Sequence, residues 1–407
     1  MIPETRAADF DAADPLASYR ERFILPEGVI YLDGNSLGAL PKATPGRVQE
    51  VVEREWGEGL IRSWNTASWF DMATRIGGKI APLVGAQPHE VIACDSTSVN
   101  LFKLIAAALQ MRPGRKVVLS EPGNFPTDLY MIAGLEAQGL AERRLAERER
   151  LAEALDGDVA LLTLTHVHYK TGALFDMAAL TRAAHEAGAL VLWDLSHSTG
   201  ALPVDLNAVG ADFAVGCGYK YLCGGPGAPA FAFVAERHQA SLKQPLTGWF
   251  GHAAPFAFSD DYAGAPGIER MQCGTPPVLG LAALEIGVDL IAEIGAARLY
   301  AKSQALSEFF LESLMAHEVQ IELVSPPRAG ERGSQLSFRH PEAYAICQAL
   351  IARGVIGDFR TPDVLRLGFA PAYLSFADMA AAARHLAEVL ASGEWRREEF
   401  NQRAAVT

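Results

Sequence analysis

Residues 191–197, VLWDLSH, are an apolar run that leads into an acidic residue, Asp194. A second apolar run, at residues 213–215, leads into GCGYKYLCGGPG, residues 216–227, where Lys220 precedes a glycine-rich turn. Short apolar runs bounded by Gly or Asp are typical of buried parallel strands. Because ligands of α/β domains bind at the carboxyl ends of such strands, we expect Asp194 and Lys220 to lie close together at one edge of a mostly parallel sheet.

The same pattern continues along the chain on both sides of this pair. Apolar runs predict further strands at residues 116–119 and 159–165. Longer amphipathic segments predict helices at residues 44–57, 98–110, 141–155 and 177–186. The charges of AERRLAERERLAEAL, residues 141–155, are mixed in sign, which favours a solvated helix face over a nucleic-acid contact. Strands that alternate with helices predict an α/β domain with a mostly parallel sheet.

We expect three regions along the chain. Prolines and glycines interrupt residues 1–43, which we expect to form an N-terminal arm. Residues 44–277 are expected to form the large α/β domain. After Pro276 and Pro277, residues 278–407 are expected to form a long connecting helix, to about residue 317, and a small C-terminal α+β domain. The strands predicted for the small domain are residues 321–324, 335–338 and 364–369.

The composition excludes several classes of protein. Half of the residues are hydrophobic and 20% are charged, as in soluble folded proteins. The 35 basic and 48 acidic residues give a net charge of −13, whereas nucleic acids and anionic membranes bind basic faces, so we expect neither as a partner. No apolar stretch reaches the roughly 18 residues of a membrane helix, and residues 1–15 lack a signal-peptide pattern, so we expect a cytoplasmic protein. The five cysteines form no CxxC pair, and we expect neither a disulfide framework nor a metal site.

Asp194 and Lys220 are the residue types that pyridoxal phosphate requires. A lysine amine can bind this cofactor covalently, and a carboxylate can keep its ring nitrogen protonated. By themselves the two residues could also be surface groups or an ordinary ion pair. A second feature favours pyridoxal phosphate: the hydroxyl residues Ser96, Thr97 and Ser98 stand at the start of a predicted helix. Hydroxyls and free N–H groups at a helix start suit a phosphate. Simple helix capping by one of these hydroxyls is the alternative.

Eight segments, in order along nearly the whole chain, carry a resemblance to one enzyme family. They are YLDGNSLG (31–38), STSVNLFKL (96–104), EPGNFPTDLY (121–130), DLSHSTG (194–200), GYKYLCGGPG (218–227), LTGWFGH (246–252), CGTPP (273–277) and VLRLGFAPAY (364–373). The combination of GNFPTD, YKYLCGGPG and GWFGH is far more specific than a lysine motif alone. On these segments the chain resembles the kynureninases, which are pyridoxal-phosphate enzymes of the aspartate-aminotransferase-like fold.

The resemblance implies a role for each matching residue. Lys220 would bind the cofactor covalently, and Asp194 would pair with its ring nitrogen. His197 would support the cofactor by a hydrogen bond, Tyr219 would relay a proton, and Phe125 would stack on the ring. The other cofactor-binding residues would be Thr97, Ser98, Asp128 and Thr165, with Trp249 and Thr275 reaching in from the neighbouring subunit. The active site is therefore expected at the interface of a homodimer.

Two further residues are predicted to contact the substrate. Arg366 lies in the apolar pattern VLRL, where a guanidinium needs an anion; the resemblance favours the substrate carboxylate over a structural salt bridge. Trp64 stands where relatives that prefer the 3-hydroxylated substrate have hydrogen-bonding side chains, which predicts a preference for unsubstituted kynurenine. His166 and His168 are expected on one face of a strand without a third metal ligand, and Cys347 is expected in the core.

Kynureninases hydrolyse the bond between the β and γ carbons of L-kynurenine, or of its 3-hydroxy form, to give anthranilate, or 3-hydroxyanthranilate, and L-alanine. The resemblance implies this hydrolase reaction in tryptophan catabolism, on the kynurenine pathway that also serves NAD biosynthesis. Two alternatives stay open at this point. An aminotransferase or a cysteine desulfurase would share the lysine, the aspartate and the phosphate site. A nucleotide-binding or regulatory protein that kept the fold without the chemistry would bind no pyridoxal phosphate.

Overall fold

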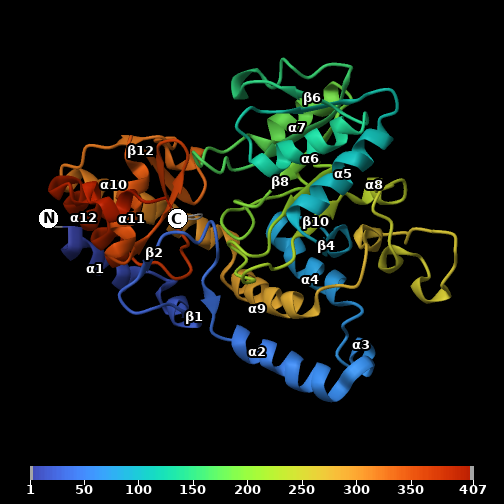
Figure 1. Ribbon diagram of the computed structural model, residues 1–407, viewed down its shortest axis with the longest axis horizontal. Helices are drawn as coiled ribbons and strands as arrows, with labels where there is room; N and C mark the ends of the chain where they lie inside the picture. Colours follow the sequence, from blue (N-terminus) through green and yellow to red (C-terminus); the bar gives the residue numbers. More distant parts are fainter. Residues whose placement is uncertain (1–2, 404–407) are drawn as a thin grey trace.

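The computed structural model describes residues 3–403, which fold around two principal sheets (Figure 1). The larger sheet has seven strands in the order β4-β10-β9-β8-β7-β5-β6. These strands are β4 (Val91–Ala93), β5 (Val117–Ser120), β6 (Glu142–Leu145), β7 (Val159–Thr165), β8 (Leu190–Asp194), β9 (Phe213–Gly216) and β10 (Phe231–Val234). Each neighbouring pair in the series β9-β8-β7-β5-β6 is parallel. Strand β10 is antiparallel to both of its neighbours, β9 and β4. The predicted α/β class and all four strands predicted for this sheet are confirmed.

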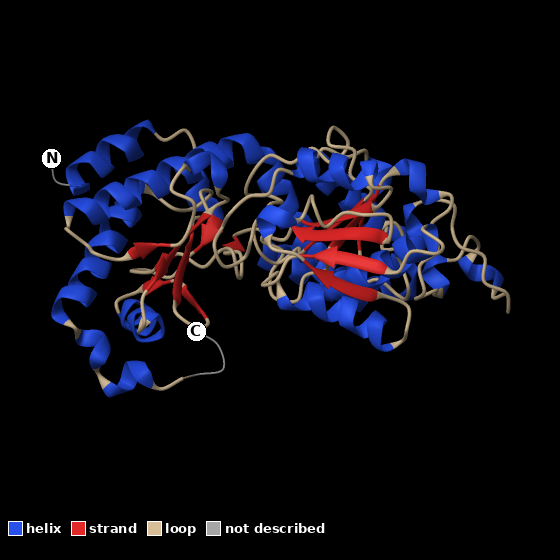
Figure 2. Cartoon of the chain, turned by 90° about the horizontal axis from the view of Figure 1, so that it is seen from above, coloured by secondary structure: helices blue, strands red, loops and turns tan. Residues whose placement is uncertain are grey.

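Helices lie on both faces of the larger sheet, above and below its strands in the right-hand lobe of Figure 2. This cover explains the continuous apolar runs, since every residue of β7 and β8 is buried. The helices from this part of the chain are α2 (Thr44–Glu50), α3 (Ser63–Thr66), α4 (Met72–Ile80), α5 (Thr97–Met111), α6 (Pro126–Ala137), α7 (Met177–Glu186), α8 (Glu236–Gln239) and α9 (Val278–Ile294). A π-helix, Val51–Gly59, continues α2.

The smaller sheet has four antiparallel strands in the order β11-β12-β15-β14. It comprises β11 (Glu322–Leu323), β12 (Gln335–Arg339), β14 (Asp358–Arg360) and β15 (Val364–Gly368), with helices α10 (Ala296–Ala316), α11 (Ala343–Ala352), α12 (Phe376–Ser392) and α13 (Glu398–Asn401). The predicted single long helix is two helices, because Gly295 has a φ of 89° and separates α9 from α10. Cys347 is fully buried in α11, as predicted.

The segment predicted as an N-terminal arm contains a helix, α1 (Pro3–Ala13), that packs against α12. The carboxylate of Asp11 accepts hydrogen bonds from the backbone N–H groups of Phe376 and Ala377, at 2.7 and 3.0 Å. Two short pairings attach the rest of the segment: β1 (Phe23–Ile24) with β3 (Leu40–Pro41), and β2 (Ile30–Tyr31) with β13 (Val355–Ile356). The sequence of α1 has no apolar periodicity that would predict a helix. Its helical structure is stabilised by packing on α12, which is distant in the sequence.

The helix predicted at residues 141–155 is wrong. Residues Glu142–Leu145 form β6, the edge strand that pairs in parallel with β5, and a single 3-10 turn follows at Arg148–Arg150. Three of the four side chains of β6 are exposed. Charged side chains on an edge strand prevent it from pairing with other chains. The sequence of β6 therefore carries mixed charges and no apolar face, which is also the pattern of a solvated helix.

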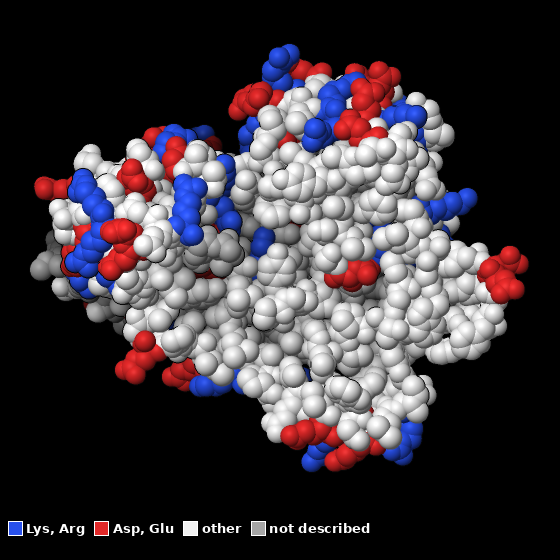
Figure 3. Space-filling view, viewed as in Figure 1, with Lys and Arg blue, Asp and Glu red and all other residues white. Residues whose placement is uncertain are grey.

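Lys and Arg lie among Asp and Glu around the rim of the face in Figure 3, whose centre carries few charges. Of the described helices, none combines the length and the apolar character needed to span a membrane.

Glu121, which directly follows β5, is a buried carboxyl, and its Oε1 has no hydrogen-bond partner among the described residues. Burial raises the pKa of Glu121 to about 7 from a usual 4.5, although Arg148 opposes the shift. Between pH 4.5 and 7 the folded state therefore binds more protons than the unfolded chain, and the free energy of unfolding falls as the pH rises. We expect Glu121→Gln to stabilise the protein at pH 8 by on the order of 2 kcal/mol, and to have little effect near pH 4.5.

Urea unfolding of both proteins across this pH range measures the difference. Glu142→Gln is the matched control, because Glu142 is exposed on β6 and should show no such pH-dependent gain. A stability difference between Glu121→Gln and the parent that stays constant with pH would contradict the prediction.

Candidate active site

A cavity of about 310 Å³ opens where the parallel strands end. Thr165 and Asp194 are the last residues of β7 and β8, and Lys220 follows the end of β9. Nine of the residues predicted for the site line this cavity: Thr97, Ser98, Phe125, Asp128, Thr165, Asp194, His197, Tyr219 and Lys220. They meet because the carboxyl ends of neighbouring parallel strands lie at one edge of the sheet.

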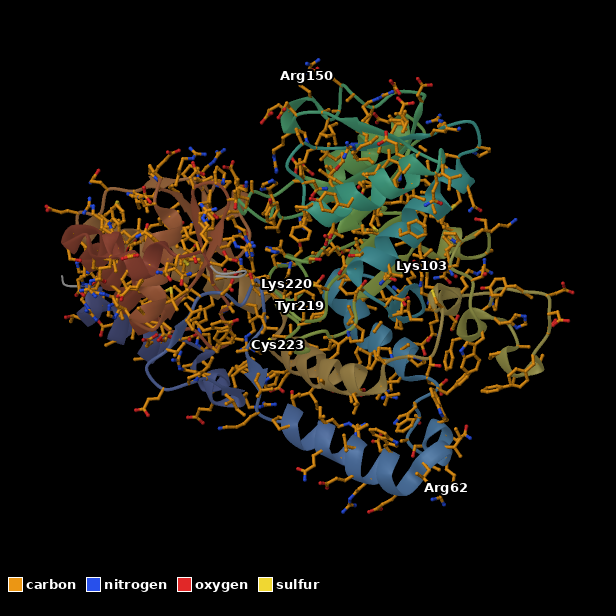
Figure 4. All side chains as sticks on the ribbon, in the orientation of Figure 1. Arg62, Lys103, Arg150, Tyr219, Lys220 and Cys223 are labelled. Atoms are coloured by element: carbon orange, nitrogen blue, oxygen red, sulfur yellow. The ribbon has the colours of Figure 1, made fainter. Side chains whose placement is uncertain are left out.

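Lys220 and Tyr219 lie near the middle of the molecule, between the lobe of the smaller sheet and the lobe of the larger one (Figure 4). Lys220 is 8% exposed, and its Nζ lies 5.7 Å from the ring centroid of Phe125 and 5.9 Å from that of Tyr219. Within residues 3–403 its amine forms no hydrogen bond or ion pair. A buried amine without a fixed partner is free to react with a ligand in the cavity.

Two buried carboxyls face the same cavity. Asp194 accepts a hydrogen bond from the backbone N–H of Ser196 at 2.7 Å. Thr165 Oγ1 lies 3.0 Å from Asp128 Oδ2 and 2.5 Å from Asn124 Oδ1, while Asp128 Oδ1 has no hydrogen-bond partner within residues 3–403. Burial raises the pKa of both Asp128 and Asp194. Such carboxyls gain most from a cationic partner in the cavity.

Helix α5 begins at the cavity wall. Ser96 caps the helix, since its hydroxyl accepts a hydrogen bond from the backbone N–H of Val99 at 3.3 Å. Capping therefore uses one of the three hydroxyls, and those of Thr97 and Ser98 stay available at the first turn. A helix N-terminus with spare donors is a site for an anion such as a phosphate.

His197 is 3% exposed, and its Nδ1 lies 3.0 Å from Oε1 of Gln335. His166 and His168 do not share a strand face, because β7 ends at Thr165. His166 contacts the Ser198 hydroxyl at 2.9 Å, whereas His168 lies 3.1 Å from the carbonyl oxygen of Gly123. The described part of the chain holds no group of three His, Cys, Asp or Glu side chains that could bind a metal ion.

Arg366 does not line the cavity; it is 2% exposed and pairs with Asp358. Its Nε donates to Asp358 Oδ1 at 2.8 Å, and its Nη2 donates to Oδ2 of the same carboxylate and, at 2.8 Å, to the Ser36 hydroxyl. Its Nη1 donates to the carbonyl of Tyr169, a cavity residue, at 2.7 Å. The carboxylate of Asp358 is therefore the anion that this arginine needs. Arg366 itself lies behind Tyr169, a residue of the cavity wall.

Three other predicted residues lie outside the cavity. Trp64 and Trp249 both pack against Phe250, at ring-centroid distances of 5.8 and 4.7 Å. Trp249 is 41% exposed and Thr275 is also exposed. Within one chain these side chains are not brought to Lys220.

The kynureninase C-terminal domain family matches residues 299–386. Kynureninase from Burkholderia mallei strain SAVP1 is 50% identical to the chain, and the alignment covers 100% of both proteins. The kynureninase of Pseudomonas fluorescens is 49% identical, with 98% of both covered. The chain belongs to the kynureninase family. It is therefore an enzyme of that family.

Solved structures show which fold this kynureninase-family chain adopts. A cysteine desulfurase from Thermococcus onnurineus NA1 matches with a TM-score of 0.79 and 19% identity, over 92% of this chain and 98% of that one. A C-DES mutant, with glycine covalently linked to its pyridoxal-phosphate cofactor, also gives 0.79, with 16% identity over 90% and 98%. At such identities the likeness concerns the fold alone. The predicted fold of the pyridoxal-phosphate-dependent transferases is confirmed.

Some cavity residues of this kynureninase-family chain escaped the sequence analysis. Thr127 and Ser196 line the cavity and stand inside motifs that were singled out for their neighbours, GNFPTD and DLSH. Tyr169 also lines the cavity, but it lies in a turn beyond β7 without a local pattern. Only the folding of that turn toward β12 brings it to the site.

Proposed function

We propose that the protein hydrolyses the Cβ–Cγ bond of L-kynurenine to anthranilate and L-alanine, with pyridoxal phosphate as cofactor. The observation that carries the proposal is full-length identity of about one half to proteins named kynureninase, in a chain whose cavity holds Lys220, Asp194 and the start of α5. Cysteine desulfurases share the fold at under 20% identity, which supports no shared activity. We place the reaction in tryptophan catabolism, in the cytoplasm.

The residues of the cavity fit this cofactor. The spare hydroxyls of Thr97 and Ser98 at the start of α5 suit its phosphate. The raised pKa of Asp194, caused by burial, suits a protonated ring nitrogen as partner, and Asp128 has an unpartnered oxygen on the same side. The face of Phe125 suits stacking on the ring. When bound, pyridoxal phosphate supplies an aldehyde that combines with amines and a ring that accepts electrons.

Each of three side chains has its own role in the proposed reaction. Lys220 would hold the cofactor, and its amine, when free, would take the proton from the substrate α-carbon. Tyr219 would move protons in the later steps, since it lines the same cavity. Arg366 binds the substrate carboxylate, for which it must share its donors with Asp358 and the Tyr169 carbonyl.

Formation of anthranilate tests the function directly. Purified protein with pyridoxal phosphate and L-kynurenine is expected to produce anthranilate, followed by fluorescence, and an equal amount of L-alanine. A shifted cofactor spectrum without anthranilate would favour an aminotransferase or a desulfurase. Protein that binds no pyridoxal phosphate would favour a non-catalytic role. The same assay with 3-hydroxykynurenine tests the proposed preference for the unsubstituted ring, and equal efficiency on both would contradict it.

We further propose a homodimer in which Trp249 and Thr275 complete the cavity of the partner. Their position away from Lys220 in one chain supports this arrangement. A hybrid dimer with Lys220→Ala in one chain and Trp249→Ala in the other should keep one intact site and about half of the parent activity. A hybrid with both changes in one chain and none in the other should be inactive, because each site then lacks one residue.

Two affinity tags allow each hybrid dimer to be purified and assayed. The reverse order of activities would place Trp249 in the site of its own chain and contradict the proposal.

A further inference from the structure

Gln335 is a buried amide that joins the two sheets. It begins β12 in the smaller sheet, is 1% exposed, and reaches His197, a residue of the cavity wall. Its Oε1 lies 3.0 Å from His197 Nδ1 and accepts from Asn35 Nδ2 at 3.4 Å. Its Nε2 donates to the carbonyl oxygen of Tyr169 at 3.0 Å. Gly172, with a φ of 75°, packs so closely that a Cβ there would lie 2.8 Å from Gln335 Cγ.

The Tyr169 carbonyl determines which way the amide faces. A carbonyl oxygen only accepts hydrogen bonds, so the group that Gln335 directs at it must be the NH₂. Turning the amide over would place its oxygen against this carbonyl and its NH₂ against the NH₂ of Asn35. Oε1 therefore faces His197. Because an amide oxygen has no proton to donate, His197 Nδ1 must carry one.

The second ring nitrogen of His197 then has a free lone pair. Burial, followed by the charges of Lys220 and Arg366, holds the pKa of His197 well below its usual range, so the ring is neutral. Among residues 3–403 no group forms a hydrogen bond to Nε2, and the ring lines the cavity of Lys220. We propose that Gln335 is a positioning residue that fixes His197 in its Nδ1-protonated form and so presents Nε2 to the cavity as a hydrogen-bond acceptor.

This inference deepens the proposed function and rests on it only for the identity of the ligand that meets Nε2. An acceptor at this position favours a ligand group that carries a proton, such as a hydroxyl or N–H, and disfavours a bare anion. The same Tyr169 carbonyl also accepts from Arg366, so Gln335 and the proposed carboxylate-binding arginine share one anchor. Which ring nitrogen of His197 is protonated, at the larger sheet, thus depends on docking of the smaller sheet, which carries Gln335.

Nitrogen NMR of protein labelled with ¹⁵N in histidine tests the inference, with and without pyridoxal phosphate. The His197 signals are identified by their absence in His197→Asn. We expect a protonated Nδ1 and an unprotonated Nε2 in the parent. Gln335→Met removes the acceptor and should lose the Nδ1–H signal in favour of Nε2–H. Gln335→Glu keeps an acceptor and should retain Nδ1–H.

Gln304→Met is the matched control, because Gln304 lies on α10 and donates only to the carbonyls of Arg332 and Gly333, at 3.5 Å each. It should leave the His197 signals unchanged. A protonated Nε2 in the parent would overturn the inference without any variant, as would an unchanged Nδ1–H in folded Gln335→Met. If the parent protein did not hydrolyse kynurenine, these signals would still be as expected, so failure of the proposed function and failure of this inference can be told apart.

Discussion

Replacing Lys220 with alanine is expected to reduce anthranilate formation on the order of 10⁴-fold, because the chain then lacks both the covalent anchor and the base that takes the α-proton. No other lysine lines the cavity among the described residues, and the amine of Lys220 has no bonding partner that its loss would strand. The fold should therefore persist. Purified Lys220→Ala should also lack the absorbance of lysine-bound cofactor.

Anthranilate fluorescence and the absorption spectrum measure the two effects on one sample. Lys243→Ala is the matched control, since Lys243 is an exposed lysine that does not line the cavity, and it should behave as the parent. Turnover by Lys220→Ala within tenfold of the parent would remove Lys220 from the proposed chemistry.

Replacing Asp358 with alanine is expected to lower the free energy of unfolding by about 3 to 5 kcal/mol. This carboxylate is 1% exposed, and it accepts from Arg366, Arg360 and the hydroxyl of Ser36. Without it two guanidinium groups lose the carboxylate to which they donate hydrogen bonds, and Arg366 is too deeply buried to be hydrated. Arg366 also loses its orientation, so the KM for L-kynurenine should rise more than kcat falls.

Guanidinium unfolding and steady-state kinetics measure these changes. Asp363→Ala is the matched control, because Asp363 also pairs with an arginine, Arg339, at 3.4 Å but both side chains are partly exposed. Its expected cost is below about 1 kcal/mol. A similarly small cost for Asp358→Ala would contradict the assigned role of the buried pair.

The central part of the site was predictable because its residues are local features of neighbouring strands. β8 is apolar up to Asp194 and β9 carries no polar side chain, and their parallel pairing, Asp194 beside Val215, brings Asp194 and the segment of Lys220 to one edge. A short local pattern likewise shows the start of α5, where Ser96 caps the helix. Hydrophobic burial and helix capping act within a few residues of sequence, so their patterns can be recognised in a single chain.

The sequence pattern was misleading where burial is incomplete. β6 is an edge strand with exposed charges, so its residues resemble a solvated helix. The helix after Pro277 was predicted to run past Gly295, because isolated glycines inside an apolar pattern can be tolerated in a helix, as Gly280 and Gly287 are in α9. The pairing of β6 with β5 lies outside its own segment, whereas the break between α9 and α10 is the backbone conformation of Gly295 itself.

The apolar strands, the glycine-rich turn after Lys220 and the motif residues of the cavity follow from the sequence alone, since each depends on interactions between near neighbours. The partner of Arg366 and the proton of His197 do not. Asp358 reaches Arg366 across paired strands, and Gln335 lies 138 residues from His197 along the chain. Neither contact leaves a periodic trace. The pair of Asp358 and Arg366 depends on which strands of the smaller sheet lie side by side and in which register. The contact of Gln335 with His197 depends on how the two sheets dock, and docking is driven by non-directional burial of apolar surface.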